Sequence, residues 1–328
     1  MVANASPLVL LVTLVDRIPL APPTGPQRGR PRVYSDRLFL KALVIMVLRH
    51  LATVHALLAV LEQPTPEMQQ LRHLLMDAGR YPSRRTFERR LAQIPDTLPA
   101  QIACLGQHLL TIIQPWEQTG RAVAIDSTVI RAFGGAVWHK RDREAGHVPH
   151  TAIDTEAHWT KSDWHGWIYG WKLHLVTTVA AVWIPVAAEV TAANVADNTQ
   201  AAGLLPDIPD AARFILGDTH YHDLALQAQA AEHGQVIVAS RRGGTRPRTN
   251  DGAVVRSLFH ALRSHAIENF NGQFKAIFDI RRPVPTRGLR ATRRLLLGAV
   301  LVYQLALLHR HQVGEPLRVG LKPFLQAA

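Results

Sequence analysis

Residues 122–128 read Ala-Val-Ala-Ile-Asp-Ser-Thr, a short apolar run that ends in an acid at Asp126. A second apolar run ends in the same way at Asp218, and a third acid, Glu268, lies in a segment whose apolar residues have helical spacing. Short apolar runs are typical of buried strands. Two carboxylates at strand ends and one on a helix can converge on a single point. The combination predicts a site for two Mg²⁺ ions, for which Mn²⁺ can substitute, and such a pair suits in-line attack on a phosphodiester.

The segment that carries Glu268 can be tested by angle. At about 100° per residue, Gly272 lies about 40° and Lys275 about 20° from Glu268, so the three share one face of a helix. The apolar residues gather on the opposite side and are Ile267, Phe270, Phe274 and Ile277. We expect this apolar stripe to pack against a sheet while Glu268 and Lys275 face a cleft. The alternative is an ordinary surface pair seven residues apart.

The composition favours a polyanionic partner. The chain has 37 Lys and Arg against 25 Asp and Glu, a formal net charge of +12, and such side chains release counterions from nucleic-acid phosphates. A merely basic protein has the same balance. The single cysteine, Cys104, excludes an intramolecular disulfide framework and suits a reducing cytoplasm. Residues 43–61 carry Arg49 and two histidines, and the apolar run 295–308 is too short to span a bilayer, so we expect no membrane segment.

The pattern of elements changes near residue 119. Before it, cap residues and apolar spacing predict helices over 36–61, from Pro66 to about Gly79, over 83–94 and over 99–114. After it, β-rich runs predict five strands, at 122–130, 168–178, 182–190, 213–218 and 235–240. Helical stretches are expected at 197–205, 223–233, 258–280 and 291–310. The sequence therefore predicts an all-helical region followed by an α/β domain.

Arginine is concentrated in three places. Four arginines lie on the predicted helix 83–94, namely Arg84, Arg85, Arg89 and Arg90. Six more lie within fourteen residues that contain no acid, namely Arg281, Arg282, Arg287, Arg290, Arg293 and Arg294. Residues 241–248 form a third cluster in a Gly/Pro-rich loop. Without interspersed acids, phosphate binding is favoured over a solvated charged face. A short Arg-rich helix after a tight turn is also typical of the second helix of a helix-turn-helix, although a generic amphipathic helix has the same pattern.

Taken in order, these segments resemble the DDE transposases of bacterial insertion sequences. The resemblance rests on the three acids and on residues 170–175 and 191–197 between the two Asp, and it covers roughly residues 120–311. It implies an RNase H-like catalytic domain at 119–312, with a mixed five-stranded sheet flanked by helices. An all-α, helix-turn-helix-like DNA-binding region would precede it at 33–118. Residues 1–32 would be an arm or linker and 313–328 a C-terminal tail.

The resemblance also implies a function and further site residues. Asp126, Asp218 and Glu268 would hold the metal ions and catalyse cleavage and transfer of strands at terminal inverted repeats, in a homodimer assembled on double-stranded DNA of the nucleoid. Lys275 fits a Glu-x6-Lys signature of one large group, in which the Lys holds the DNA backbone, and Lys172 occupies a position that approaches DNA. That signature also expects Tyr and Arg seven and four residues before the Glu, where this chain has Ala261 and Ser264.

Other classes of site and protein fit less well. An aspartic protease needs two Asp-Thr/Ser-Gly turns, and neither Asp is followed by that glycine. A zinc site needs paired cysteines or His-Glu-x-x-His, and neither occurs. His220 and His222 either approach the metal site or are local polar groups. An inactive transposase-derived DNA-binding protein and another RNase H-like nuclease remain the alternatives.

Overall fold

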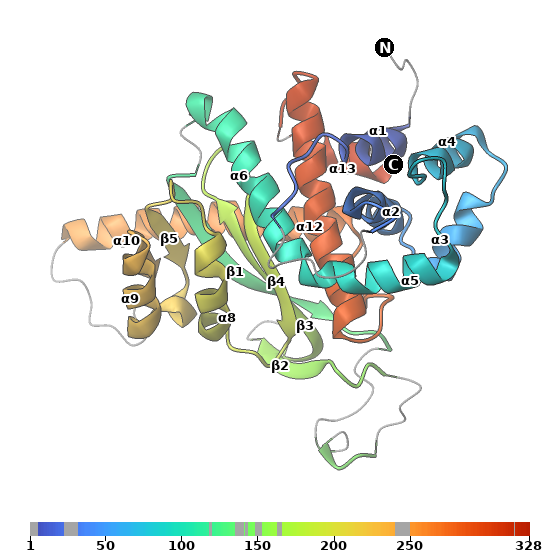
Figure 1. Cartoon of the computed structure of the whole chain (residues 1–328). Coiled ribbons are helices and arrows are strands. Elements are labelled where there is room, and N and C mark those ends of the chain that lie inside the picture. Colours follow the sequence, from blue (N-terminus) through green and yellow to red (C-terminus); the bar gives the residue numbers. More distant parts are fainter. Residues whose placement is uncertain are drawn as a thin grey trace. The chain divides into compact units, whose positions relative to one another are not determined.

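The computed structural model describes residues 6–22, 32–117, 120–134, 141, 144–147, 153–162, 166–239, 250–317 and 319–328. The chain divides into two compact units, of which the first combines Met1–Leu105 with Arg290–Ala328 and the second is Gly106–Leu289 (Figure 1). The first unit is helical and the second contains the sheet. The arginine cluster at 241–248 lies outside the described residues.

The helical unit begins with five short helices and the start of a long one. They are α1 (Pro7–Leu14), α2 (Asp36–Leu48), α3 (Val54–Leu61), α4 (Pro66–Leu74), α5 (Arg84–Gln93) and α6 (Leu98–Glu117), with a 3₁₀ turn η1 (Ile94–Asp96) before α6. The prediction of one helix over 36–61 is wrong, because α2 ends at Leu48 and His50 takes a left-handed conformation with φ 52°. Thr53 then caps α3 by accepting the N–H of Ala56.

The long helix α12 (Leu289–Gln312) belongs, from Arg290 on, to the helical unit. A Cβ on Gly298 would lie 3.0 Å from side chains of Leu43 and Val47 on α2, and Gln304 donates to the carbonyl of Ile102 at 2.8 Å. Among the described helices α12 alone is long and apolar enough to cross a membrane, and 78% of its apolar window is buried within the protein. It is therefore built as a core helix.

The compact units differ from the predicted domains at both ends of the chain. The predicted catalytic domain extended to residue 312, whereas the sheet unit ends at Leu289. The predicted arm at 1–32 contains α1, which is capped by Ser6 and has buried leucines and valines. The predicted tail contains α13 (Leu321–Gln326), with Leu321 and Leu325 buried. Both terminal segments thus contribute apolar side chains to the helical unit.

The sheet is mixed and has six strands, one more than predicted. They are β1 (Ala122–Arg131), β2 (His158–Ser162), β3 (Gly166–Thr178), β4 (Pro185–Ala192), β5 (Phe214–Gly217) and β6 (Val236–Ala239). The order is β2-β3-β1-β5-β6, and β4 also pairs with β3; β1–β5 and β5–β6 are parallel and the other pairs antiparallel. Strand β2 was missed because it has no buried residue and hence no apolar run or alternation.

Helices flank the sheet. They are α8 (Asp197–Leu204), α9 (Leu224–Glu232), α10 (Asn250–Arg263) and α11 (Asn269–Ile277), with 3₁₀ turns η2 (Leu205–Asp207) and η3 (Thr219–Tyr221). Figure 1 shows α8 and α9 in front of the strands and α10 behind them. The predicted helix over 258–280 is interrupted by one π-helical turn, η4 (Ser264–Glu268). Its predicted apolar stripe is confirmed, since Ile267, Phe270, Phe274 and Ile277 are all buried.

Close packing of β1 against β3 requires a glycine at position 170. A Cβ there would overlap the carbonyl oxygen of Ile130 on the neighbouring strand. We expect Gly170→Ala to lower the free energy of unfolding by about 3 kcal/mol or more, because backbone atoms cannot yield as a side chain can. Gly272→Ala is the matched control, because nothing lies within 4 Å of a Cβ there and alanine should stabilise α11 by about 1 kcal/mol. Urea unfolding measures both, and equal effects would contradict the packing argument.

Candidate active site

The parallel register of β1 and β5 sets two of the three acids at one level of the sheet. Ala122 faces Phe214 and Ala124 faces Leu216, an offset of 92 residues. Asp126 and Asp218 are separated by the same 92 residues. Asp126 lies inside β1 and not at a strand end as predicted, but β5 has already ended at Gly217. Extending the register by two residues therefore brings Asp126 level with Asp218.

Asp126 is a largely buried carboxylate. Its side chain is 22% exposed, and its Oδ1 accepts the N–H of Ser127 at 2.8 Å. Burial raises the pKa of Asp126 to about 7; Arg263 and the Ser127 N–H oppose the rise, whereas the charges of Asp218 and Asp197 add to it. The carboxyl group therefore changes charge near neutral pH.

Asp218 caps the turn that follows β5. Its Oδ1 accepts the N–H of His220 at 2.8 Å, and its Oδ2 lies 3.0 Å from His220 Nδ1. His220 is thus a neighbour of the site, while His222 Nδ1 lies 3.3 Å from the amide of Gln227. The turn gives Asp218 a fixed orientation.

Tyr221 packs beneath these acids. A Cβ on Gly217 would lie 2.7 Å from the Cβ of Tyr221, so the glycine is needed for this close approach. The Tyr221 hydroxyl is buried and has no hydrogen-bond partner among the described residues. Burial raises its pKa well above the usual value, and Asp126, Asp197 and Asp218 raise it further. An unpaired buried hydroxyl beside three carboxylates can donate to an oxygen ligand.

Arg263 links Glu268 to Asp126 through two ion pairs. Arg263 Nη2 lies 3.1 Å from Glu268 Oε1, and its Nη1 lies 3.7 Å from Asp126 Oδ2. Ser264 Oγ also lies 3.0 Å from Glu268 Oε1. The guanidinium therefore lies between the first and third acids. The Glu268 side chain is 56% exposed, so it can change its contacts.

The π-helical turn η4 brings the side chains of Arg263 and Glu268 into contact. In an α-helix, residues five apart point about 140° away from each other. A π-turn has i→i+5 geometry, which brings such residues onto one face. The chain has Ser264 where the Glu-x6-Lys signature expects arginine, and the extra residue of η4 places Arg263 against the glutamate instead.

Lys275 lies beside β1. Its ammonium donates to the carbonyl of Val129 at 3.1 Å, three residues beyond Asp126. Burial lowers the pKa of Lys275, Arg281 lowers it further, and Asp126 opposes the shift. The lysine predicted to share a face with Glu268 is therefore close to the strand that carries Asp126.

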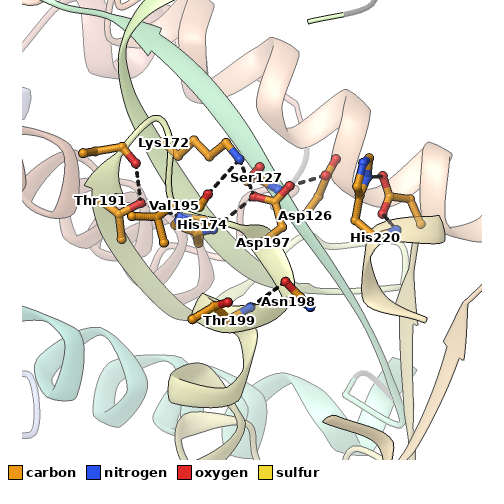
Figure 2. Close-up of polar contacts among 12 residues, drawn as sticks. Asp126, Ser127, Lys172, His174, Thr191, Val195, Asp197, Asn198, Thr199 and His220 are labelled. Atoms are coloured by element: carbon orange, nitrogen blue, oxygen red, sulfur yellow. Dashed lines mark hydrogen bonds and ion pairs between the residues drawn. The ribbon is translucent and has the colours of Figure 1, made fainter. Parts of the chain in front are cut away.

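Lys172 is held by Asp197, a residue that the sequence analysis did not assign a role (Figure 2). Lys172 Nζ lies 3.0 Å from Asp197 Oδ1 and donates to the carbonyl of Val195. The buried His174 lies 3.7 Å from Asp197, and burial lowers its pKa to about 4, with Lys172 adding to that shift and Asp197 opposing it. Figure 2 shows Asp197 next to Asp126. The Lys172 ammonium thus links β3 to Asp197 in the first turn of α8.

An open pocket of about 240 Å³ lies beside Asp218. Its lining residues come from the ends of β5 and β6 and from α10, and they are Gly217, Asp218, Thr219, Val238, Ala239, Phe259, His260 and Arg263. Both the acid and the arginine of the site therefore border space that is open to solvent.

The arginines of α5 have different surroundings. Arg90 is buried, contacts Asp36 and stacks over the ring of Phe39 with 4.5 Å to its centroid. Arg84 pairs with Glu88 at 2.8 Å on the surface. The other two, Arg85 and Arg89, are exposed, and the described part of the chain gives them no ion pair. Of the four arginines of α5, Arg85 and Arg89 are therefore the two that present a charge to solvent without an ion pair among the described residues.

The arginines between 281 and 294 are mostly engaged as well. Arg287 donates to the carbonyl of Ile153 at 2.9 Å and Arg294 to that of Ala52 at 3.1 Å. In the helical unit, Asp96 pairs with both Arg290 and Arg293. A segment without acids therefore still finds an acidic partner from elsewhere in the sequence. Among the residues that the structure describes, the Arg281 side chain makes one long hydrogen bond, to the Gly272 carbonyl at 3.4 Å, and Arg282 is exposed.

The donor set fits a hard divalent cation. Carboxylate oxygens are the ligands that Mg²⁺ prefers, and the unpaired Tyr221 hydroxyl adds a donor for a water or carboxylate of a loaded site. Within the described ranges, however, no three His, Cys, Asp or Glu side chains lie close enough to hold an ion in this arrangement. Glu268 would have to leave Arg263 to complete such a set.

Three residues of the site were not predicted. Arg263 lies five residues before Glu268, one residue outside the spacing of the Glu-x6-Lys signature, and the π-helical turn that brings it into place has no clear sequence signal. Asp197 was quoted within 191–197 but given no role. Tyr221 lies three residues after Asp218, and this closeness in sequence is the one local signal that places it near the site.

A family model described as Transposase DDE domain matches residues 117–305. No curated protein matches the sequence. Among solved structures, a piggyBac transposase synaptic complex with hairpin DNA aligns with a TM-score of 0.37 and 9% identity, covering 98% of this chain and 79% of that one. A TM-score of that size does not establish a common fold.

The raised pKa of Asp126 predicts how stability depends on pH. Between about pH 4 and 7 the unfolded chain loses this proton while the folded chain keeps it, so the free energy of unfolding falls as the pH rises. We expect Asp126→Asn to remove that loss and to be more stable than wild type by about 2 kcal/mol at pH 8, but not at pH 4, in metal-free buffer. Urea unfolding at both pH values measures this, with Asp210→Asn, an exposed acid of the same unit, as control. A variant less stable than wild type at pH 8 would contradict the assignment.

Proposed function

Because the chain belongs to the transposase DDE domain family, we propose that it binds the terminal inverted repeats of an insertion sequence and cleaves and transfers their DNA strands. The observation that carries the proposal is the register of β1 and β5, which sets Asp126 and Asp218 at one level, with Glu268 linked to Asp126 by Arg263. The protein would act in the cytoplasm on the DNA of the nucleoid.

Asp126, Asp218 and Glu268 are proposed to hold two Mg²⁺ ions, for which Mn²⁺ can substitute. When bound, the ions would neutralise charge on the scissile phosphate and activate the attacking oxygen. Water would be the first nucleophile and the freed 3′-hydroxyl the second, without a covalent protein intermediate. Lys275, beside the strand of Asp126, would position the phosphate by giving up its bond to the Val129 carbonyl.

The remaining contacts with DNA would come from exposed basic residues. The helical unit is proposed to recognise the terminal repeats in a helix-turn-helix-like manner, with Arg85 and Arg89 as its leading contacts. Arg281 and Arg282 would contact the DNA backbone. Lys172, Arg84, Arg90, Arg287 and Arg290 already have partners within the protein, so they would bind DNA only by giving these up.

We propose that a homodimer assembles on DNA, because one active site acts on one end whereas transposition joins two ends to one target. Sedimentation of the complex with end DNA is expected to give two protomers for each pair of ends. A complex with one protomer for two ends would contradict the dimer.

The catalytic assignment predicts the behaviour of charge-removing variants. Asp126→Asn and Glu268→Gln should each reduce cleavage of a duplex that carries the terminal repeats by on the order of 100-fold or more in Mg²⁺, because each loses a ligand at the reacting phosphate. Asp210→Asn should cleave normally. Wild-type protein that binds the ends without cleaving them would indicate an inactive DNA-binding derivative, and cleavage without preference for the ends would indicate another RNase H-like nuclease.

The different surroundings of the α5 arginines predict two different effects of substitution, one on DNA binding and the other on stability. Arg85→Ala and Arg89→Ala should weaken binding to end DNA and reduce the salt dependence by roughly one unit for each lost phosphate contact, without changing the melting temperature. Arg90→Ala should lower the free energy of unfolding by about 1 to 2 kcal/mol, because it loses Asp36 and the Phe39 ring. Filter binding at several salt concentrations and thermal melts separate the two effects. Unchanged salt dependence in the Arg85/Arg89 double variant would show that this face is only solvated.

A further inference from the structure

Arg263 supplies a positive charge between two of the acids of the site. It is a buried residue with 8% of its surface exposed, and its guanidinium lies within ion-pair distance of both Asp126 and Glu268. The two acids come from different parts of the fold, one from a strand and the other from η4. Arg263 is the last residue of α10, immediately before that turn. A single side chain therefore neutralises two of the three proposed metal ligands.

The chain departs from regular helix geometry to make this contact. The π-helical turn aligns residues five apart, and Arg263 and Glu268 are the residues that it aligns. A π-turn interrupts the regular α-helical hydrogen-bond ladder and is frequently found at functional sites. An arginine whose only use was to stabilise the surface would not require such a turn.

A guanidinium and a divalent cation exclude each other at these oxygens. The guanidinium is permanently charged and uses its fork of N–H groups to hold carboxylates, so a bound cation would meet both its charge and its bulk. The Lys275 ammonium interacts electrostatically with Asp126 and adds a second positive charge near β1. A metal therefore has to displace Arg263 from its carboxylates before it can use both of them.

We propose that Arg263 is the resident counter-cation of this site, that a divalent metal competes with it for Asp126 and Glu268, and that a phosphate of bound DNA draws it away. This inference rests on the proposed function, since it requires those acids to bind metal. Arg263 borders the open pocket beside Asp218, so a phosphate that enters there can meet its guanidinium. DNA and metal would then bind cooperatively, which delays loading of the site until the substrate is present.

The test is the affinity for Mn²⁺, measured by titration calorimetry on the full chain. Arg263→Gln should bind Mn²⁺ roughly tenfold more tightly than wild type without DNA, within the range of about 5- to 150-fold that is typical of coupled sites. With duplex DNA from the ends of the element, wild-type affinity should rise by a similar factor and that of Arg263→Gln should not. Arg213→Gln is the matched control, because it removes one exposed positive charge from the same unit, and within the described ranges the Arg213 guanidinium makes a single long hydrogen bond, to the Gly234 carbonyl.

Arg263→Lys keeps the charge without the fork and covers the case in which the glutamine variant does not fold. It should bind Mn²⁺ with an affinity between those of wild type and Arg263→Gln, and thermal melts without metal verify its folding. Folded variants that bind Mn²⁺ no more tightly than wild type, or a DNA effect that persists in Arg263→Gln, would overturn the competition. No Mn²⁺ binding by any form, with or without DNA, would instead overturn the proposed function.

Discussion

Parallel pairing of β1 with β5 is the constraint around which the site is arranged, because it places residues 92 positions apart at the same level and on the same face of the sheet. Neither acid could be moved by one residue without turning its side chain to the opposite face. The pairing covers only three residue pairs, since β5 is four residues long. The short strand is useful, because β1 extends past it and carries Asp126 beyond the last paired residue. A longer β5 would cover that position with backbone.

Collecting acids at one point has an electrostatic cost, and the fold offsets it with cations from separate segments. Asp197 has Lys172 from β3, and Asp126 shares Arg263 with Glu268. Burial of Asp126 is incompletely compensated, because its pKa rises to about 7 despite the arginine. A perturbed pKa of this kind is common at functional sites, where some folding stability is lost in favour of reactivity. The buried Tyr221 hydroxyl, which has no hydrogen-bond partner in the described part of the chain, belongs to the same pattern.

The sequence was informative where a signal is local. The apolar stripe of α11 and the residues that cap α4 and α5, Thr65 and Ser83, are each set by neighbouring residues, and each is found in the structure. Of the two predicted strand-end acids, Asp218 follows β5 as expected, whereas Asp126 lies inside β1. The sequence was uninformative where interacting residues are distant in sequence. Asp96 forms ion pairs with arginines about 200 positions away, and Asp36 forms one with Arg90. The π-turn and strand β2 were not predicted either, since one inserted residue or one half-buried five-residue strand leaves the hydrophobic pattern unchanged.

The division of the chain has a consequence for its synthesis. The sheet unit is one continuous segment, whereas the helical unit is completed by α12 and α13 from the other end of the sequence. Domains usually fold in the order in which they leave the ribosome, but here the first-made helices must wait for their core helix until the sheet unit has emerged. Until then α2 exposes the apolar face on which Gly298 packs. A chain cut short after residue 290 would therefore lose the unit whose synthesis began first.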